Sequence, residues 1–102
     1  MRAAIHEWTL DTFTRLVGES FGVSAAADLE PEIELTLIEA QASRMAEYDG
    51  RHPFSLVFQG SIESALAQQV VVMQHAELGA AELLMVPIGA DADSVRYEVI
   101  FA

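Results

Sequence analysis

The sequence predicts a mainly β domain, namely a small antiparallel, partly open barrel or roll of about six strands with a short N-terminal helix. Three observations predict this fold class. Val95, Tyr97, Val99 and Phe101 alternate with Arg96, Glu98 and Ile100, which is the period of two expected along a strand with one buried face. Other extended segments recur at short intervals between glycine, proline and aspartate residues. The connections are too short for helical crossovers, so neighbouring strands must pair antiparallel.

The one predicted helix lies between Thr9 and Gly18. Thr9 can cap its first turn, and Gly18 can end it. The apolar residues of this segment recur at helical spacing, and they are Leu10, Phe13, Leu16 and Val17. We expect a helix of about two turns that plugs one end of the barrel.

The strands are predicted from runs of alternating or β-branched residues. The last three should form a meander, because only tight turns separate them. Six segments qualify: Phe21–Ser24, Ile33–Leu37, Phe54–Phe58, Gln69–His75, Glu82–Ile88 and Val95–Phe101. In the last of these, the odd-numbered residues should be buried, whereas Arg96 and Glu98 should face solvent.

Turns and loops are predicted where proline, glycine and aspartate gather. Asp28–Pro31 is an expected turn, because proline fixes φ and favours extended geometry in its predecessor. Gln41–Pro53 is an expected loop, in which Met45 and Tyr48 could form a helical turn. Ser61–Leu66 is either a short helix or a covered loop. The remaining turns are expected at Gly60, Glu77–Gly79 and Gly89–Ser94.

Length and composition indicate one acidic domain, residues 1–102. The chain has 102 residues, no cysteine and a formal net charge of −11 from sixteen acidic residues and five arginines. Disulfides, thiolate metal sites and a cysteine nucleophile are therefore excluded. Nucleic-acid binding needs clustered basic groups, and these arginines are scattered, so we expect no nucleic-acid partner. Docking on an anionic membrane is disfavoured for the same reason.

The apolar segments are too short for a membrane-spanning helix. Uninterrupted apolar runs have at most four residues, as in Val70–Met73, whereas a membrane helix needs about 20 residues. The first residues lack the apolar core of a secretory signal. These features predict a cytoplasmic protein, or one that leaves the cell only inside an assembly.

No catalytic, cofactor-binding or metal-binding residues are predicted. Asp91, Asp93 and Glu98 lack the register of a calcium loop, and the two aspartates are better explained as turn residues whose side chains bond nearby backbone. The serines Ser55 and Ser61 lack a nucleophile elbow. The three histidines lie in different segments: His6, His52 and His75. We expect His75, at the edge of a turn, to bond backbone groups.

Acidic residues repeat at a spacing of two in Glu30, Glu32 and Glu34, with Glu39 nearby. This spacing places the first three on one strand face. Charge on an exposed strand blocks strand-to-strand aggregation, and this protective role is the favoured interpretation. The alternative is a surface that faces an arginine-rich partner.

Three segments together resemble a family of uncharacterised small bacterial proteins. They are Pro53–Gly60, His75–Gly79 and, as the most specific, Val86–Phe101. Leu10–Phe13 and Val17–Gly18 extend the resemblance over nearly the whole chain. Proteins of this kind often occur beside tail-collar-like proteins of phage type, which implies a structural or assembly role. The resemblance carries no activity, and therefore no catalytic residues.

These observations predict a non-enzymatic structural or protein-interaction domain within a larger bacterial or phage-tail-like assembly. The partner would be another protein or a second copy of the chain. The alternative is a small-molecule-binding barrel with a pocket at its mouth, lined by Trp8, Phe13, Phe58 and Tyr97, although aromatic residues in small barrels are more often core.

Overall fold

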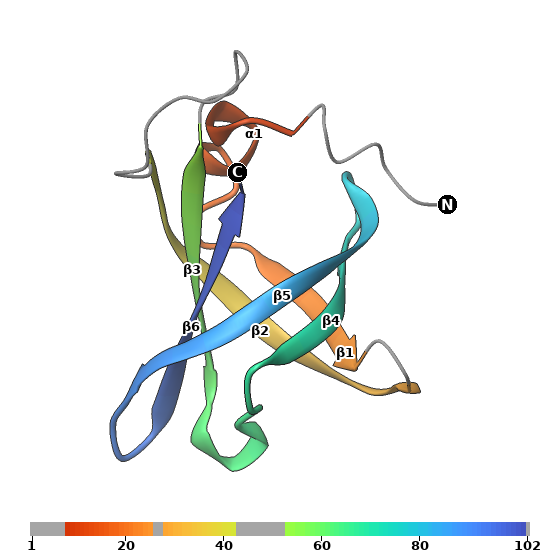
Figure 1. The fold of residues 1–102 in the computed structure, drawn as a ribbon, viewed down its shortest axis with the longest axis vertical. Helices are drawn as coiled ribbons and strands as arrows, with labels where there is room; N and C mark the ends of the chain where they lie inside the picture. Colours follow the sequence, from red (N-terminus) through yellow and green to blue (C-terminus); the bar gives the residue numbers. More distant parts are fainter. Residues whose placement is uncertain (1–7, 26–27, 43–52, 102) are drawn as a thin grey trace.

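Six antiparallel strands form a closed barrel in the computed structural model, and one short helix lies at one end (Figure 1). The structure describes residues 8–25, 28–42 and 53–101, and only the backbone of residues 28–32. The predicted mainly β fold class, the short N-terminal helix and the antiparallel barrel are confirmed. The barrel is closed in its strand order rather than partly open, because β1 pairs with β4.

The elements follow one another with short connections. Helix α1 spans Leu10–Thr14, which is shorter than the two turns expected, and a 3₁₀-helix, η2, spans Ile62–Ser64. The strands are β1 Ser20–Ala25, β2 Asp28–Ala42, β3 Phe54–Ser61, β4 Gln69–His75, β5 Gly79–Ala90 and β6 Ser94–Phe101.

The strand order around the barrel is β1-β2-β3-β6-β5-β4. Hairpins join β1, β2 and β3, and the predicted meander of β4, β5 and β6 is confirmed. The chain between β3 and β4 crosses one end of the barrel, so that β4 returns beside β1 (Figure 1). Three consecutive strands with the fourth beside the first make a Greek key.

The predicted turn at Asp28–Pro31 is wrong, because β2 begins at Asp28. Asp28 pairs with Ala25, and the next paired residue of β2 is Ile33, opposite Val23. The residues between them, Pro31 included, lie in a bulge of β2. Proline cannot donate a ladder hydrogen bond, and a bulge is one of the few places where a sheet accepts it.

Gly60 does not end β3, contrary to prediction. It lies within the strand, opposite Val95 of β6. A Cβ at this position would collide with the Leu35 side chain of β2. Glycine is therefore required here for a close approach between neighbouring strands, rather than for a turn.

The connections after β4 and β5 lie where they were predicted, but the neighbouring strands extend into them. Residues 41 and 42 belong to β2, and residues 43–52, including the possible helical turn at Met45 and Tyr48, lie outside the described residues. The Glu77–Gly79 turn is confirmed, although Gly79 also begins β5. The turn after β5 is reduced to residues 91–93, because β5 continues to Ala90 and β6 starts at Ser94.

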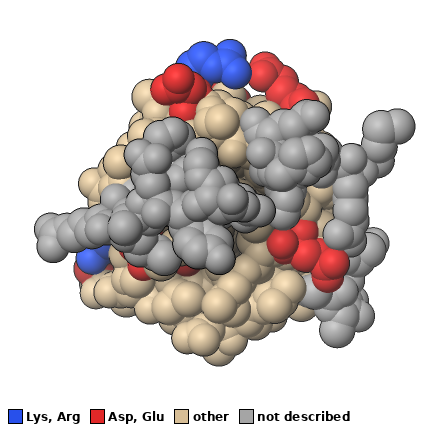
Figure 2. Space-filling model, turned by 45° about the horizontal axis from the view of Figure 1, so that its top comes forward, with Lys and Arg blue, Asp and Glu red and all other residues tan. Residues whose placement is uncertain are grey.

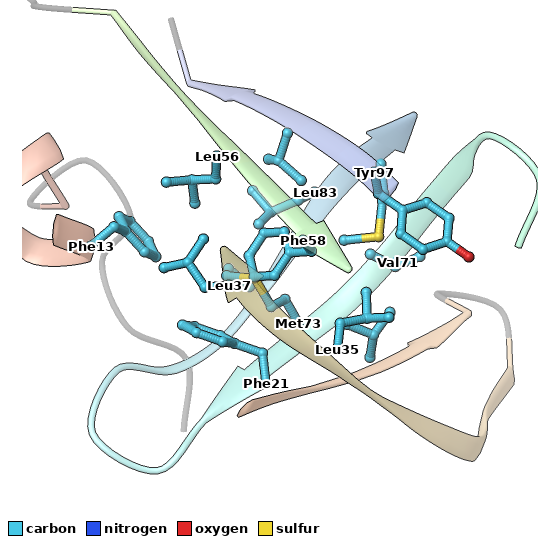
Figure 3. Packing of buried hydrophobic residues seen from close by; sticks show 14 of the residues in the cluster. Phe13, Phe21, Leu35, Leu37, Leu56, Phe58, Val71, Met73, Leu83 and Tyr97 are labelled. Atoms are coloured by element: carbon cyan, nitrogen blue, oxygen red, sulfur yellow. The ribbon is translucent and has the colours of Figure 1, made fainter. Parts of the chain in front are cut away.

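The interior of the barrel is filled by apolar side chains from all six strands and from α1 (Figure 3). Val95, Tyr97 and Val99 of β6 are buried, as the alternation predicts, and Phe101 is partly buried. Ile100 on the opposite face of the strand is exposed. One register therefore fixes the whole strand.

Aromatic side chains close the end of the barrel beside α1. Phe13 of the helix is fully buried, and its ring lies 5.6 Å from Trp8, 5.8 Å from Phe54 and 5.5 Å from Phe101. Phe54 and Phe101, on β3 and β6, stack with centroids 4.7 Å apart. The predicted role of the helix as a plug is therefore confirmed, although one residue carries most of it.

The opposite end is closed by the connection between β3 and β4. The Tyr97 hydroxyl points away from the packed core (Figure 3) and accepts a hydrogen bond of 2.8 Å from the Leu66 N–H. The Ile62 N–H donates to the Asp93 carbonyl over 3.0 Å, and Ile62 and Leu66 pack on the core. Ser61 accepts from the Glu63 N–H at the start of η2. Both predicted forms of this segment thus contribute, as a short helix within a covering connection.

Candidate interaction surface

The four aromatic residues predicted to line a pocket are not brought together at the barrel mouth. Phe13, Phe58 and Tyr97 are fully buried in the core, and Trp8 packs on it from the α1 end. Phe58 and Tyr97 are cross-strand partners of β3 and β6, whereas Phe13 enters from the helix (Figure 3). These side chains fill the interior, as aromatic residues of small barrels usually do.

Asp91 shapes the turn between β5 and β6, as predicted. Its Oδ1 atom accepts hydrogen bonds from the N–H groups of Asp93 and Ser94, each of 2.8 Å, and from the Ser94 hydroxyl. The two backbone bonds lower the pKa of the Asp91 carboxyl, with smaller contributions from the Ser94 hydroxyl and the Arg96 charge. Asp93 contributes its backbone groups rather than its carboxylate. The arrangement orders a tight turn.

His75 bonds a backbone group, as predicted, and also has an acidic partner that the sequence did not reveal. Its Nδ1 atom accepts from the Glu77 N–H at 3.1 Å, so Nε2 carries the proton of the neutral ring and donates to Glu19 Oε1 at 2.8 Å. The imidazole also packs against the Phe21 ring at 4.7 Å. His75 thus ties the β4–β5 hairpin to the start of β1. His6 and His52 lie outside the described residues.

The geometry assembles no familiar catalytic or metal-binding constellation in the part of the chain that the structure describes. Over residues 8–25, 33–42 and 53–101, no three acidic or histidine side chains come together as metal ligands. Ser55 is buried, and Ser61 caps η2.

The acidic residues Glu30, Glu32 and Glu34 lie on a part of β2 that is only partly paired. β2 pairs with β1 at Asp28 and at residues 33–36, and with β3 from Thr36 to Ala42. Glu30 and Glu32 lie outside these paired stretches, so their protective role stays a prediction. Glu34 and Glu39 are exposed. The side chains of Glu30 and Glu32 lie outside the described residues.

Three large apolar side chains project outward from neighbouring strands of the meander. Val70 of β4 and Leu84 of β5 are cross-strand partners, and their exposed fractions are 46% and 50%. On β5, Val86 lies two residues after Leu84 and pairs with Glu98 of β6. Ile100 lies two residues after Glu98 and is therefore on the same outer face as Leu84, with 54% of its surface exposed. The outward residues Val70, Leu84 and Ile100 are called the apolar row below.

One family model decides the classification of the chain. The family described as Domain of unknown function (DUF6916) matches residues 8–101. The chain belongs to this family. No curated protein and no solved structure matches it. The predicted membership of an uncharacterised family is thereby confirmed.

One feature in the sequence of this DUF6916 domain predicts an exposed apolar residue on β4, although the alternation of apolar and polar residues does not. The run Val70–Met73 has apolar residues on both faces of its strand. Val71 and Met73 are buried in the core, whereas Val70 faces solvent. Such a run is typical of a strand covered on both faces. On the same outer face Val72 is buried, so Val70 is the exposed apolar residue of this run.

The outer surface of the DUF6916 barrel also has a shallow groove, where β2, β3 and the β5–β6 turn meet. Its volume is about 440 Å³, and it is lined by Thr36, Ile38, Gln59, Gly60, Ser61, Asp93 and Ser94. The hydroxyls of Ser61 and Ser94 are already engaged in local hydrogen bonds. Among the described residues, no helix has the length and hydrophobicity needed to cross a membrane.

Proposed function

We propose that this domain is a non-enzymatic protein-interaction domain that acts as a structural part of a larger assembly. The apolar row on β4, β5 and β6 carries the proposal. About half of the surface of each of its three side chains is exposed. Single exposed apolar residues are ordinary, but neighbouring ones on adjacent strands are typical of binding surfaces.

The packed interior supports an interaction role over ligand binding. A small-molecule site is usually a concave, largely apolar cavity. In this barrel the predicted pocket residues are core, and each end is covered, by α1 and by the β3–β4 connection. The outer face then offers the larger apolar surface, which favours contact with another protein.

The resemblance noted in the sequence supports a bacterial or phage-tail-like assembly as the setting. A compact barrel whose backbone is paired all around suits a structural component, because it presents rigid faces. We propose that the domain acts in the cytoplasm, by contact with other proteins of that assembly.

The test is capture of the assembly with and without an intact apolar row. Tagged protein is cross-linked in cells of its own host, and the attached proteins are identified by mass spectrometry. Leu84→Glu and Ile100→Glu should lose the same specific proteins. Ile38→Glu is the matched control, since Ile38 is also exposed, at 38%, but lies on β2. Identical protein sets for wild type and all three variants would refute the proposal.

A further inference from the structure

We propose that the shallow groove between β2, β3 and the β5–β6 turn binds a neutral polyhydroxy ligand, such as a sugar. This site is separate from the apolar row, and the inference goes beyond the proposed interaction function without resting on it. Three observations carry it: the strand pairing that opens the groove, the hydrogen-bonding groups that line it, and the charge around it.

The groove lies where β2 and β3 stop pairing. Their ladder ends at Thr36 and Gln59, whereas β3 continues to pair with β6 as far as Ser61 and Ser94. Beyond the last pair the two strands diverge, towards the end of the barrel opposite α1 (Figure 1). The volume of about 440 Å³ lies within the roughly 300–1,000 Å³ that is usual for small-molecule sites. The fold thus leaves space for a small ligand at this junction.

Three polar side chains line the groove from three different elements. They are Thr36 on β2, Gln59 on β3 and Asp93 in the β5–β6 turn, and their side chains make no hydrogen bond to another described residue. The neighbouring Ser61 and Ser94 hydroxyls are used locally, in the cap of η2 and in the turn. A hydroxyl, an amide and a carboxylate therefore remain for a ligand.

The donors and acceptors of these groups select hydroxyls in the ligand. An ionised carboxylate only accepts hydrogen bonds, whereas an amide both donates and accepts. An ammonium group could donate to Asp93, but it would leave the Gln59 N–H groups without an acceptor. Adjacent ligand hydroxyls can donate to the carboxylate and accept from the amide at the same time. Such adjacent hydroxyls are the defining feature of sugars.

The charge around the groove disfavours an anionic ligand. No residue that lines the groove is basic. Arg96 pairs with Gln59, but its guanidinium extends over Gly89 on β5, because a Cβ there would lie 2.8 Å from an arginine terminal nitrogen. The chain also has a formal net charge of −11, and in Figure 2 acidic side chains stand in several separate groups around the α1 end. An anion would meet the Asp93 carboxylate without a compensating charge.

The test is an NMR titration of the intact, isotopically labelled protein. The probes are four neutral disaccharides, namely maltose, cellobiose, lactose and mannobiose, with spermidine as a cationic probe and citrate as an anionic one. Asp93→Asn and Gln59→Ala are the test variants. Asp11→Asn on α1 and Gln74→Ala on β4 are their matched controls, because each makes the same change at an exposed residue outside the groove. Circular dichroism checks that all four variants remain folded.

At least one disaccharide should shift the signals of Thr36 and Asp93, with the millimolar affinity expected of an open site. Asp93→Asn and Gln59→Ala should each weaken this binding roughly fivefold, as loss of one hydrogen bond does, whereas the two controls should leave it unchanged. Raising the salt from about 0.15 M to about 1 M should have little effect, because the ligand is neutral. Spermidine and citrate should not shift these signals.

Other outcomes would overturn the inference. They are the absence of shifts with all four disaccharides at tens of millimolar, shifts centred away from the groove, and equal weakening by the control variants. Tighter binding of spermidine at Asp93 would make the ligand a cation and would refute the polyhydroxy assignment. None of these results bears on the apolar row, so the proposed interaction function stands or falls separately, on the cross-linked proteins in the host.

Discussion

Gly60 of β3 and Leu35 of β2 face one another inside the barrel at a distance that leaves no room for another carbon atom. The sequence shows a glycine after an apolar strand, and such a glycine more often marks a turn. Only the pairing of β2 with β3 reveals what the residue does. This close approach leads to a specific prediction for a single added methyl group.

Gly60→Ala should destabilise the protein by about 1–3 kcal/mol, because the added Cβ forces the packed Leu35 side chain to move. Leu35→Ala alone should cost about 2–5 kcal/mol through the cavity it leaves. In the double variant the new methyl occupies part of that cavity, so the combined cost should be less than the sum. Urea unfolding of the three variants measures this coupling, and strict additivity would contradict the steric explanation.

Asp91 gives stability a dependence on acid pH. Its folded-state pKa lies below the ordinary value of 3.8. The ionised carboxylate therefore stabilises the fold above pH 3.8, and this contribution disappears as the pH falls through the folded-state pKa. Asp91→Asn should unfold at lower urea than wild type near neutral pH, and the difference should shrink below pH 3.8. Asp11→Asn, on exposed α1, is the control; an unchanged gap at low pH would be the contrary result.

Among the elements, β6 was the best predicted and β2 the worst. The alternation of β6 determines its inner face from Val95 to Val99 without knowledge of its neighbours. In β2, Pro31 gave the signal of a turn, because a proline in an unbroken ladder would remove a hydrogen bond. The bulge opposite β1 accommodates it, and a bulge depends on the register between two strands. Local sequence does not contain that register.

The burial of each side chain on β6 determines how much stability its truncation should cost. Phe101→Ala should cost about 2–3 kcal/mol, somewhat less than for a fully enclosed phenylalanine, because Phe101 is only partly buried and stacks on Phe54. Arg96→Ala should cost less than about 1 kcal/mol, since its interactions lie at the surface. Urea unfolding compares the two directly. A larger loss for the arginine variant would place Arg96 in a structural role on the outer face.

For the whole molecule, the number of strands could be predicted but their closure could not. Six extended segments and tight turns are local features, whereas the β1–β4 ladder joins residues as distant as Gly22 and Gln74. The apolar row depends on the same global arrangement, because Val70, Leu84 and Ile100 are scattered along the chain and meet through the pairing of β4, β5 and β6. Tertiary pairing of this kind leaves little trace in a single sequence.

The distant pairings predict slow folding. Ladders β1–β4 and β3–β6 connect segments far apart in sequence, and chain entropy must be lost before those contacts form. We expect refolding in milliseconds to seconds, as for other all-β domains of this size. Stopped-flow dilution from urea, followed by Trp8 fluorescence, measures the rate. Refolding within microseconds would indicate that local contacts dominate instead.

The contact between Trp8 and Phe101, with ring centroids 6.3 Å apart, brings opposite extremes of the described chain to one site. A short glycine–serine linker could therefore join the segment after Phe101 to the segment before Trp8. New termini could then be opened in the exposed hairpin between Ala76 and Glu77. Such a circular permutant would keep every strand pair while reversing the order in which the two halves of the barrel are synthesised. The closed strand order is therefore compatible with chain termini at more than one position around the barrel.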